Sequence, residues 1–475
     1  MRSLITARTR AEWGVITVAV SIATLLFAPI SPFAVINSDS SIYILMTREF
    51  RGLSDLYYWG QNRIGSAVPL LAQLFKPIVG TDAALSIAQI GLLGVGYFCF
   101  THWLKSPLSR IVFAIVWFVP SFIEVGILGQ PYTAQFAFLG LALWLFDQPA
   151  TATKHGLASL SLMISIWVSD ASIIYPVILL VFWRRFNLQK HLKPKVAAVL
   201  LGAIWIAIAK FQAPSVKSYG AFMKLSEMLG FSQSLFSDLL VKTCLDPVAF
   251  ARTALILITF GLFLKHRPSK LSWLWQFALL SINLNLLLIL TSKWVLLNSP
   301  GGIVAYRYFA PVYLWGAVLV LLTIESLQLP RSWIRTLQAA AIVLAVVSST
   351  IAGTSLLTYV SRMAPGVEAL PVRTPPLVAA INRVSPGGVI GDYWTAYLWC
   401  SIDQRFVCTP HQGSVIRQVR YTLEVQQQRV VYLVKQGWLT EFPNQTVQFG
   451  RSLKRIGDAQ TVNYLTIAPY QWIEK

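Results

Sequence analysis

Long apolar segments recur through most of the 475-residue chain, and only a fold that crosses a membrane can bury them all. Hydrophobic residues make up 55% of the sequence and charged residues only 12%, a balance too apolar for a soluble globular protein. We therefore predict an α-helical polytopic membrane protein. The more polar C-terminal part is predicted to form a small α/β domain outside the cytoplasm.

The apolar segments predict about eleven transmembrane helices, since a span needs roughly 20 apolar residues and fewer where it is buried in a bundle. The short segments on either side of Asp170 can be two half-length helices or one long tilted span. Loop lysines and arginines fall on one side of the membrane only with two helices there, which favours the larger count and a cytoplasmic N-terminus. The predicted spans cover residues 13–36, 83–103, 111–126, 131–146, 157–169, 172–183, 196–211, 248–264, 273–297, 308–324 and 337–359.

The formal net charge of +20 fits this topology better than it fits nucleic-acid binding. Most basic residues lie in short loops between apolar segments, as cytoplasmic loops require. The first apolar segment is too long for a signal peptide and lacks a small-residue cleavage site, so we predict that it is retained. The segments outside the cytoplasm are then residues 37–66, 212–247, 298–307 and everything after 362.

Residues 37–66 form a polar and aromatic segment between apolar runs, and we expect the active site there. Apolar residues after Asp39 recur at helical spacing, which predicts a short amphipathic helix lying in the membrane interface. Aromatic and polar side chains follow, of the kind found at headgroup level, and we expect them to line a substrate cavity. These residues are Tyr57, Tyr58, Trp59 and Gln61.

Acidic residues at helix ends are the strongest candidates for chemistry, because an ionised side chain in lipid costs on the order of 2.5–3.5 kcal/mol. By the predicted topology, Asp39, Glu124 and Asp170 all lie at extracytoplasmic ends and can face one cavity. Each also has a structural interpretation. Asp39 can stabilise a helix N-terminus, Asp170 can cap the helix that follows it, and Glu124 can be a solvated loop residue.

Arg307 is the complementary cation, because it precedes a late span and its planar guanidinium suits a phosphate group. The alternative is an arginine that extends to lipid headgroups without a specific ligand. Arg63 and Lys293 are further candidates for binding phosphate.

The composition changes abruptly after the last span. We assign residues 1–362 to the membrane domain, 363–376 to a proline-rich linker and 377–475 to a soluble domain. Helix patterns over 377–383 and 394–403 alternate with strand patterns over 388–392, 406–408, 430–434 and 462–467, which favours an α/β fold. Cys400 and Cys408 can form a disulfide outside the cytoplasm or remain free thiols.

Metal and nucleotide signatures are absent from the sequence: there is no cysteine pair at zinc spacing, no HExxH and no GxxxxGK. These absences argue against an ATP-driven pump, and we assign no residue to a metal site.

Four features in this order resemble the C-type glycosyltransferase superfamily: an aspartate after the first span, the element YYWGQNRIGS, the turn WVSD, and RYFAP opening a late span. More narrowly, the membrane region is similar to the bacterial branch related to family 39 and the aminoarabinose and mannosyl transferases. The resemblance implies an enzyme of the bacterial plasma membrane. It would transfer a sugar from a polyprenyl-phosphate carrier to an envelope glycolipid, polysaccharide or protein, with inversion at the anomeric carbon.

The resemblance also implies roles for two residues. Asp39 would take the proton of the acceptor, and Arg307 would bind the carrier phosphate as it leaves. The resemblance implies no cofactor. Relatives differ in whether they need a divalent metal, so a metal is possible, but Asp39 lacks the neighbouring acid often seen in them, and this departure weakens a metal site.

Two other functions compete with this one. A transporter or flippase for lipid-linked or anionic solutes would use Asp170 and Arg307 in the membrane, although the sequence lacks the internal repeat that such proteins often show. The third reading is an inactive scaffold of the same fold that binds partners through its C-terminal domain.

Overall fold

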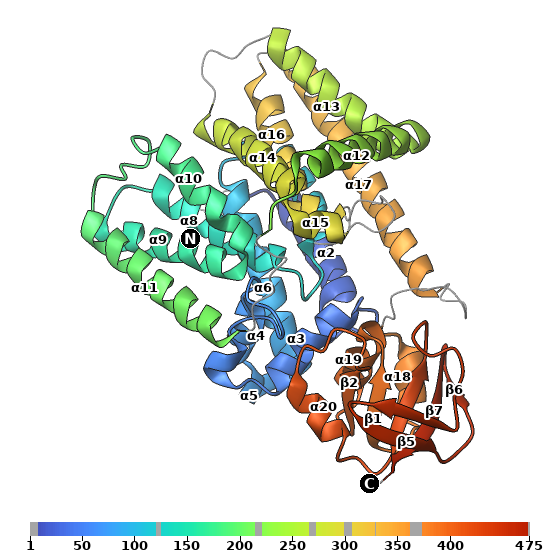
Figure 1. Ribbon diagram of the computed structural model, residues 1–475. Coiled ribbons are helices and arrows are strands. Elements are labelled where there is room, and N and C mark those ends of the chain that lie inside the picture. The colour runs from blue at the N-terminus through green and yellow to red at the C-terminus, as the bar shows by residue number, and fades with distance from the viewer. Residues whose placement is uncertain are drawn as a thin grey trace.

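The computed structural model describes residues 8–119, 125–213, 221–265, 272–298, 306–327, 329–361 and 373–473. Glu124 and most of the predicted linker lie outside these residues. Figure 1 shows the long helices grouped on one side of the molecule and a small C-terminal sheet on the other, next to α3.

A helix is present at every predicted span. These helices are α2 (Arg10–Phe27), α6 (Thr81–Thr101), α7 (Pro107–Phe118), α8 (Tyr132–Asp147), α9 (Ala152–Val168), η3 (Asp170–Ile173) with α10 (Ile174–Val181), α11 (Leu192–Gln212), α13 (Pro247–Lys265), α14 (Trp273–Thr291) with α15 (Lys293–Leu297), η6 (Tyr306–Phe309) with α16 (Ala310–Ser326), and α17 (Arg331–Ser361).

Seven helices among the described residues are long and apolar enough to cross a membrane: α2, α6, α11, α13, α14, α16 with the preceding turn, and α17. The prediction of a polytopic helical membrane protein is thereby confirmed. The other predicted spans are shorter helices, so the larger count stays a prediction. Both α2 and α7 end earlier than predicted. Their C-cap residues, Ala28 and Val119, each directly precede a proline, and a residue before proline disfavours the helical conformation.

One long helix was not predicted. α12 (Leu225–Leu245) lies in the predicted outer loop 212–247 and packs its apolar side on α14 and α15. The sequence of α12 is less hydrophobic than that of a membrane span, so the apolar pattern did not predict a helix there.

The segment after α2 folds into α3 (Ser38–Arg48), a turn η1 (Gly52–Asp55), and two short helices α4 (Ala67–Ala72) and α5 (Lys76–Val79). Asn37 caps α3 by accepting a hydrogen bond from the Ser40 N–H at 3.1 Å. The predicted helix exists, but it lacks the exposed face that an amphipathic helix would show. Its residues from Ser40 to Thr47 are buried on all sides, because the C-terminal domain covers the outer face.

The C-terminal domain is the predicted small α/β fold, with a seven-stranded sheet in the order β2-β1-β3-β7-β5-β4 and β6 paired with β7. The strands β2, β1 and β3 are parallel and the others antiparallel. Its elements are α18 (Pro375–Ile381), β1 (Gly387–Gly391), α19 (Tyr393–Ile402), β2 (Phe406–Pro410), α20 (Val419–Val425), β3 (Val431–Lys435), β4 (Gln445–Gln448), β5 (Arg451–Arg455), β6 (Gln460–Val462) and β7 (Leu465–Trp472).

The helix α19 docks directly on α3. The Ser38 hydroxyl donates to the backbone carbonyl of Tyr393 at 2.5 Å, and the Arg48 guanidinium donates to the carbonyls of Cys400 and Ser401 at 2.9 and 3.1 Å. At the end of α3, Glu49 forms an ion pair with Arg420. One buried apolar cluster continues from the 37–66 segment into the C-terminal domain. The two parts therefore meet through a packed, hydrogen-bonded interface.

Candidate active site

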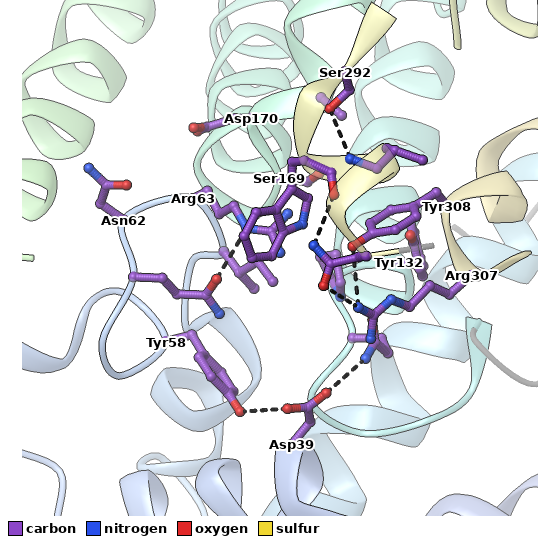
Figure 2. Close-up of a pocket in the computed structure, with 18 of the residues that line it drawn as sticks. Asp39, Tyr58, Asn62, Arg63, Tyr132, Ser169, Asp170, Ser292, Arg307 and Tyr308 are labelled. Carbon is purple, nitrogen blue, oxygen red and sulfur yellow. Dashed lines mark hydrogen bonds between the residues drawn. The ribbon is translucent and has the colours of Figure 1, made fainter. Parts of the chain in front are cut away.

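A cavity of about 900 Å³ lies where the membrane region meets the C-terminal domain. Its walls come from the first turn of α3, the loop before α4, the turn before α8, η3, the α14–α15 junction, η6 and the start of α19. Figure 2 shows Asp39 and Arg307 entering it from different elements, with both side chains directed toward its centre. Six predicted site residues line it: Asp39, Tyr58, Gln61, Arg63, Asp170 and Arg307.

Asp39 is held by hydrogen bonds from three separate parts of the chain. The Tyr58 hydroxyl donates to its Oδ1 at 3.1 Å, and the Tyr393 hydroxyl donates to the same oxygen. The Gln130 amide donates to the other oxygen, Oδ2, at a long 3.5 Å. Oδ2 is thus the less strongly engaged oxygen of the carboxylate, and it is the one available to take a proton.

Tyr58 and Tyr393 act as hydroxyl donors over the whole physiological pH range. Burial raises the pKa of each phenol well above its usual value, and the nearby charge of Asp39 raises it further. Their hydroxyl oxygens lie 3.0 Å apart. Both phenols therefore keep their protons beside the carboxylate.

The backbone around Asp39 is fixed by a glycine and a serine. Gly129 has a φ of +91°, and a Cβ on it would lie 2.6 Å from the carbonyl carbon and oxygen of Asp39. Only glycine allows this turn to approach the N-terminus of α3 so closely. The Ser40 hydroxyl also donates to the carbonyl of Leu128 at 2.7 Å. The turn before α8 and the start of α3 are thereby joined.

Arg307 is oriented by neighbours in its own stretch of chain. Its Nη2 donates to the Tyr308 hydroxyl at 3.2 Å and to Asn298 Oδ1 at a long 3.5 Å. The guanidinium carbon lies 5.1 Å from the centre of the Tyr308 ring. The hydrogen-bond partners of Arg307 among the described residues are neutral, so its positive charge at the cavity wall can bind an anion.

Asp170 lines the cavity but faces a lysine that the sequence analysis did not single out. Its Oδ2 lies 2.7 Å from Lys210 Nζ, which also donates to the carbonyl of Asn62 at 3.1 Å. In Figure 2, Asp170 stands apart from Asp39 and Arg307. The ion pair joins α11 to η3, and the hydrogen bond to Asn62 joins α11 to the loop before α4.

Arg63 lies on the same side of the cavity. Its Nε donates to Gln61 Oε1 at 3.1 Å, and its guanidinium lies 4.8 Å from the centre of the Trp294 ring. Arg63 is therefore one of the cations at the cavity wall, together with Lys210, Arg307 and Arg417.

Three other predicted residues do not line the cavity. Lys293 forms an ion pair with Glu227 on α12. Tyr57 and Trp59 are buried in the protein, and the Trp59 indole donates to Asp55 at 2.9 Å. Glu124 is outside the described residues. The structure joins Cys400 and Cys408 in a disulfide, one of the two alternatives left open.

The sequence analysis missed Tyr393, Asp392 and Arg417 as cavity residues. A signal was present: Asp392 and Tyr393 directly follow β1, and ligands commonly bind at the carboxyl ends of parallel strands. The guanidinium of Arg417 lies 5.7 and 5.3 Å from the ring centres of Tyr58 and Tyr393.

The donor set around Asp39 does not fit a divalent metal. Both carboxylate oxygens accept hydrogen bonds, and the described residues contain no group of three histidine, cysteine, aspartate or glutamate side chains that could bind a metal ion. We derive no step through a metal.

Comparisons with known proteins assign the fold. No protein-family model matches the chain, and no curated protein matches it in sequence. The crystal structure of ArnT from Cupriavidus metallidurans in the apo state matches with a TM-score of 0.56 at 10% identity, over 97% of this chain and 98% of that chain. The chain has the fold of ArnT. The undecaprenyl phosphate complex of ArnT gives a TM-score of 0.54 at 10% identity, with the same coverage.

A more distant match is the archaeal oligosaccharyltransferase AglB from Archaeoglobus fulgidus, with a TM-score of 0.42 at 12% identity over 89% of this chain and 69% of that chain. The likeness to ArnT extends over the C-terminal domain as well as the helices. The match to ArnT confirms the fold that the resemblance implied.

Proposed function

We propose that this protein is a membrane glycosyltransferase, which transfers a sugar from a polyprenyl-phosphate carrier to an acceptor hydroxyl on the outer face of a bacterial plasma membrane. The observation that carries the proposal is the convergence of Asp39 and Arg307, far apart in sequence, on one cavity at the end of a membrane bundle. The orientation has the N-terminus in the cytoplasm and the C-terminal domain outside. The shared fold with ArnT, one structure of which holds undecaprenyl phosphate, supports the carrier.

The chemistry needs few groups. Oδ2 of Asp39 takes the proton of the acceptor hydroxyl as its oxygen attacks the anomeric carbon. The bond from that carbon to the carrier phosphate breaks, and the phosphate leaves as an anion beside Arg307. A phosphate leaving group needs no protonation by a general acid, unlike the alcohol released in glycoside hydrolysis. One carboxylate is therefore sufficient.

The hydrogen bonds to Oδ1 orient the base for this step. Tyr58 and Tyr393 donate to Oδ1, so the carboxylate cannot rotate freely and Oδ2 keeps a constant direction. Such preorganisation reduces the cost of reaching the transition state.

The test is turnover of purified full-length protein with labelled undecaprenyl phosphate sugars and extracted envelope lipids as acceptors. We expect wild type to release undecaprenyl phosphate, Asp39→Asn to lose activity by at least about 10³-fold, and Arg307→Ala by about 10²-fold. The conservative exchange Glu227→Gln on α12, outside the cavity, serves as the control. Unchanged turnover in Asp39→Asn would refute its role as base.

Vesicle assays separate the competing functions. If wild type moves labelled lipid across vesicles and never cleaves the phosphate–sugar bond, the protein is a transporter. If it does neither, it is a scaffold.

A further inference from the structure

The C-terminal domain contributes one complete wall of the cavity. Asp392, Tyr393 and Trp394 line it at the junction of β1 and α19, and Ser414 and Arg417 line it from the loop before α20. We propose that this wall is a carbohydrate-binding subsite that holds a sugar ring of the acceptor, with Trp394 as its main contact. The proposal rests on the proposed function for assigning the ring to the acceptor.

Trp394 differs from the other large aromatic residues of α19. Tyr397 and Trp399 are fully buried, at 0% and 1% exposure, and belong to the core of the domain. Trp394 is only partly buried and lines the cavity. Its ring is braced by Tyr393 in an edge contact, with ring centres 5.0 Å apart and planes at 82°. A large braced ring at a cavity wall offers apolar surface for the C–H face of a sugar.

Asp392 lies next to Trp394, but its carboxylate is engaged within the domain. Its Oδ1 accepts the backbone N–H of Thr395 at 2.8 Å, which fixes the side chain at the start of α19. The Gln436 amide, in the orientation that satisfies its hydrogen bonds, donates to both carboxylate oxygens, at 2.6 and 2.8 Å. Burial raises the pKa of this carboxyl, and the hydrogen bonds from Thr395 and Trp394 act in the opposite direction. Asp392 therefore fixes the start of α19, and Trp394 is the side chain of the two that is left to contact a ligand.

The position of this wall assigns the ring to the acceptor. In an inverting displacement the acceptor oxygen enters opposite the leaving phosphate, so it lies on the far side of the donor sugar from Arg307. Tyr393, between Asp392 and Trp394 in the chain, donates to Asp39, so the wall adjoins the proposed base. An acceptor whose hydroxyl reaches Asp39 has its remaining atoms beside this wall. The acceptor therefore carries a sugar at the point of attachment.

The test measures binding of free sugars to the purified full-length protein. Saturation-transfer NMR with methyl glycosides of glucose, galactose, mannose and arabinose is expected to show millimolar binding of at least one of them. Trp394→Ala should weaken this binding about ten-fold and Trp394→Phe much less, since phenylalanine keeps an aromatic face.

The matched control is Trp438→Ala, which removes the same side chain from a partly buried site in the same domain, outside the cavity. It should leave binding unchanged, and thermal melting checks that each variant is folded. The proposal is overturned if wild type binds none of the glycosides, or if folded Trp394→Ala binds as wild type does.

The outcomes also separate this inference from the proposed function. Asp39→Asn should retain glycoside binding, because binding needs no proton transfer. If glycosides bind in a Trp394-dependent way but no undecaprenyl phosphate sugar is consumed, the proposed function is wrong and the subsite stands. If sugar transfer occurs and its KM for acceptor is the same in Trp394→Ala as in wild type, the subsite is wrong and the function stands.

Discussion

Asp39 and Arg307 share one cavity but are held in opposite ways. The partners of Asp39 come from three distant segments: Tyr58, Gln130 and Tyr393. Among the described residues, the hydrogen-bond partners of Arg307 are Asn298 and Tyr308, which lie within ten residues of it. The hydrogen bonds of the carboxylate are thus tertiary contacts, whereas those of the guanidinium are local.

This difference matches the two proposed roles, which are removal of a proton by Asp39 and binding of a phosphate by Arg307. A base must be in position before its substrate arrives, because a small misplacement costs a large factor in rate. A group that binds the phosphate of a long lipid must instead accept a ligand that enters from the bilayer and leaves again. We therefore expect the site to tolerate small changes at Arg307 and not at Asp39.

Among the exchanges that keep the charge or the ring, the largest loss of kcat is expected for Asp39→Glu. The extra methylene moves the carboxylate out of reach of at least one tyrosine, so kcat should fall about 10²–10³-fold although the charge is kept. Steady-state turnover of a carrier-linked sugar measures this. Nearly normal kcat in Asp39→Glu would mean that the hydrogen bonds do not define the position of the base.

A smaller effect is expected for Tyr393→Phe, which removes one donor to Oδ1 and keeps the ring. We expect kcat to fall about ten-fold with little change in KM for either substrate, because the hydroxyl orients the base rather than binding a ligand. Tyr58→Phe should do the same, and the double variant should show non-additive losses. A rise in KM without loss of kcat would contradict the positioning role.

Arg307→Lys should have a weaker effect still. Lysine keeps the charge but loses the planar fork, so KM for the carrier-linked sugar should rise about three- to ten-fold with a modest loss of kcat. If Arg307→Lys proves more damaging than Asp39→Glu, the comparison between the two residues is reversed.

The smallest expected effect is a change in thermal stability, and it concerns a third charged residue, Asp392. Burial raises its pKa in the folded protein, so the folded state binds the proton more tightly than the unfolded chain does. Stability is therefore lost as the pH rises from the unfolded value of about 3.9 through the folded value. Asp392→Asn removes this loss, and its melting temperature should exceed that of wild type by on the order of 1 °C at pH 7. The gain should disappear near pH 3.

Local pattern predicted most of the helices, since apolar length alone determines which segments enter a membrane. It also predicted that Asp39 and Arg307 belong to the site, because placing a charge next to an apolar segment costs free energy and such a residue is often functional. Tyr393 and Lys210 could not be predicted to face Asp39 and Asp170, because those contacts depend on how distant elements pack. The same cause misplaced Tyr57 and Trp59, since aromatic rings look alike in sequence at headgroup level and in a core.

The buried apolar cluster that runs from Ile36 and Tyr43 into Leu377 and Ile467 has a consequence for how the molecule unfolds. Two parts of a chain that share one hydrophobic core unfold together, because separating them exposes apolar surface on both. The C-terminal domain should therefore denature in the same transition as α3 and the loop before α4. A chain cut before residue 377 would lose the cooperative unit that contains Asp39 as well as the sheet, and so the soluble domain is a condition for the membrane active site to exist.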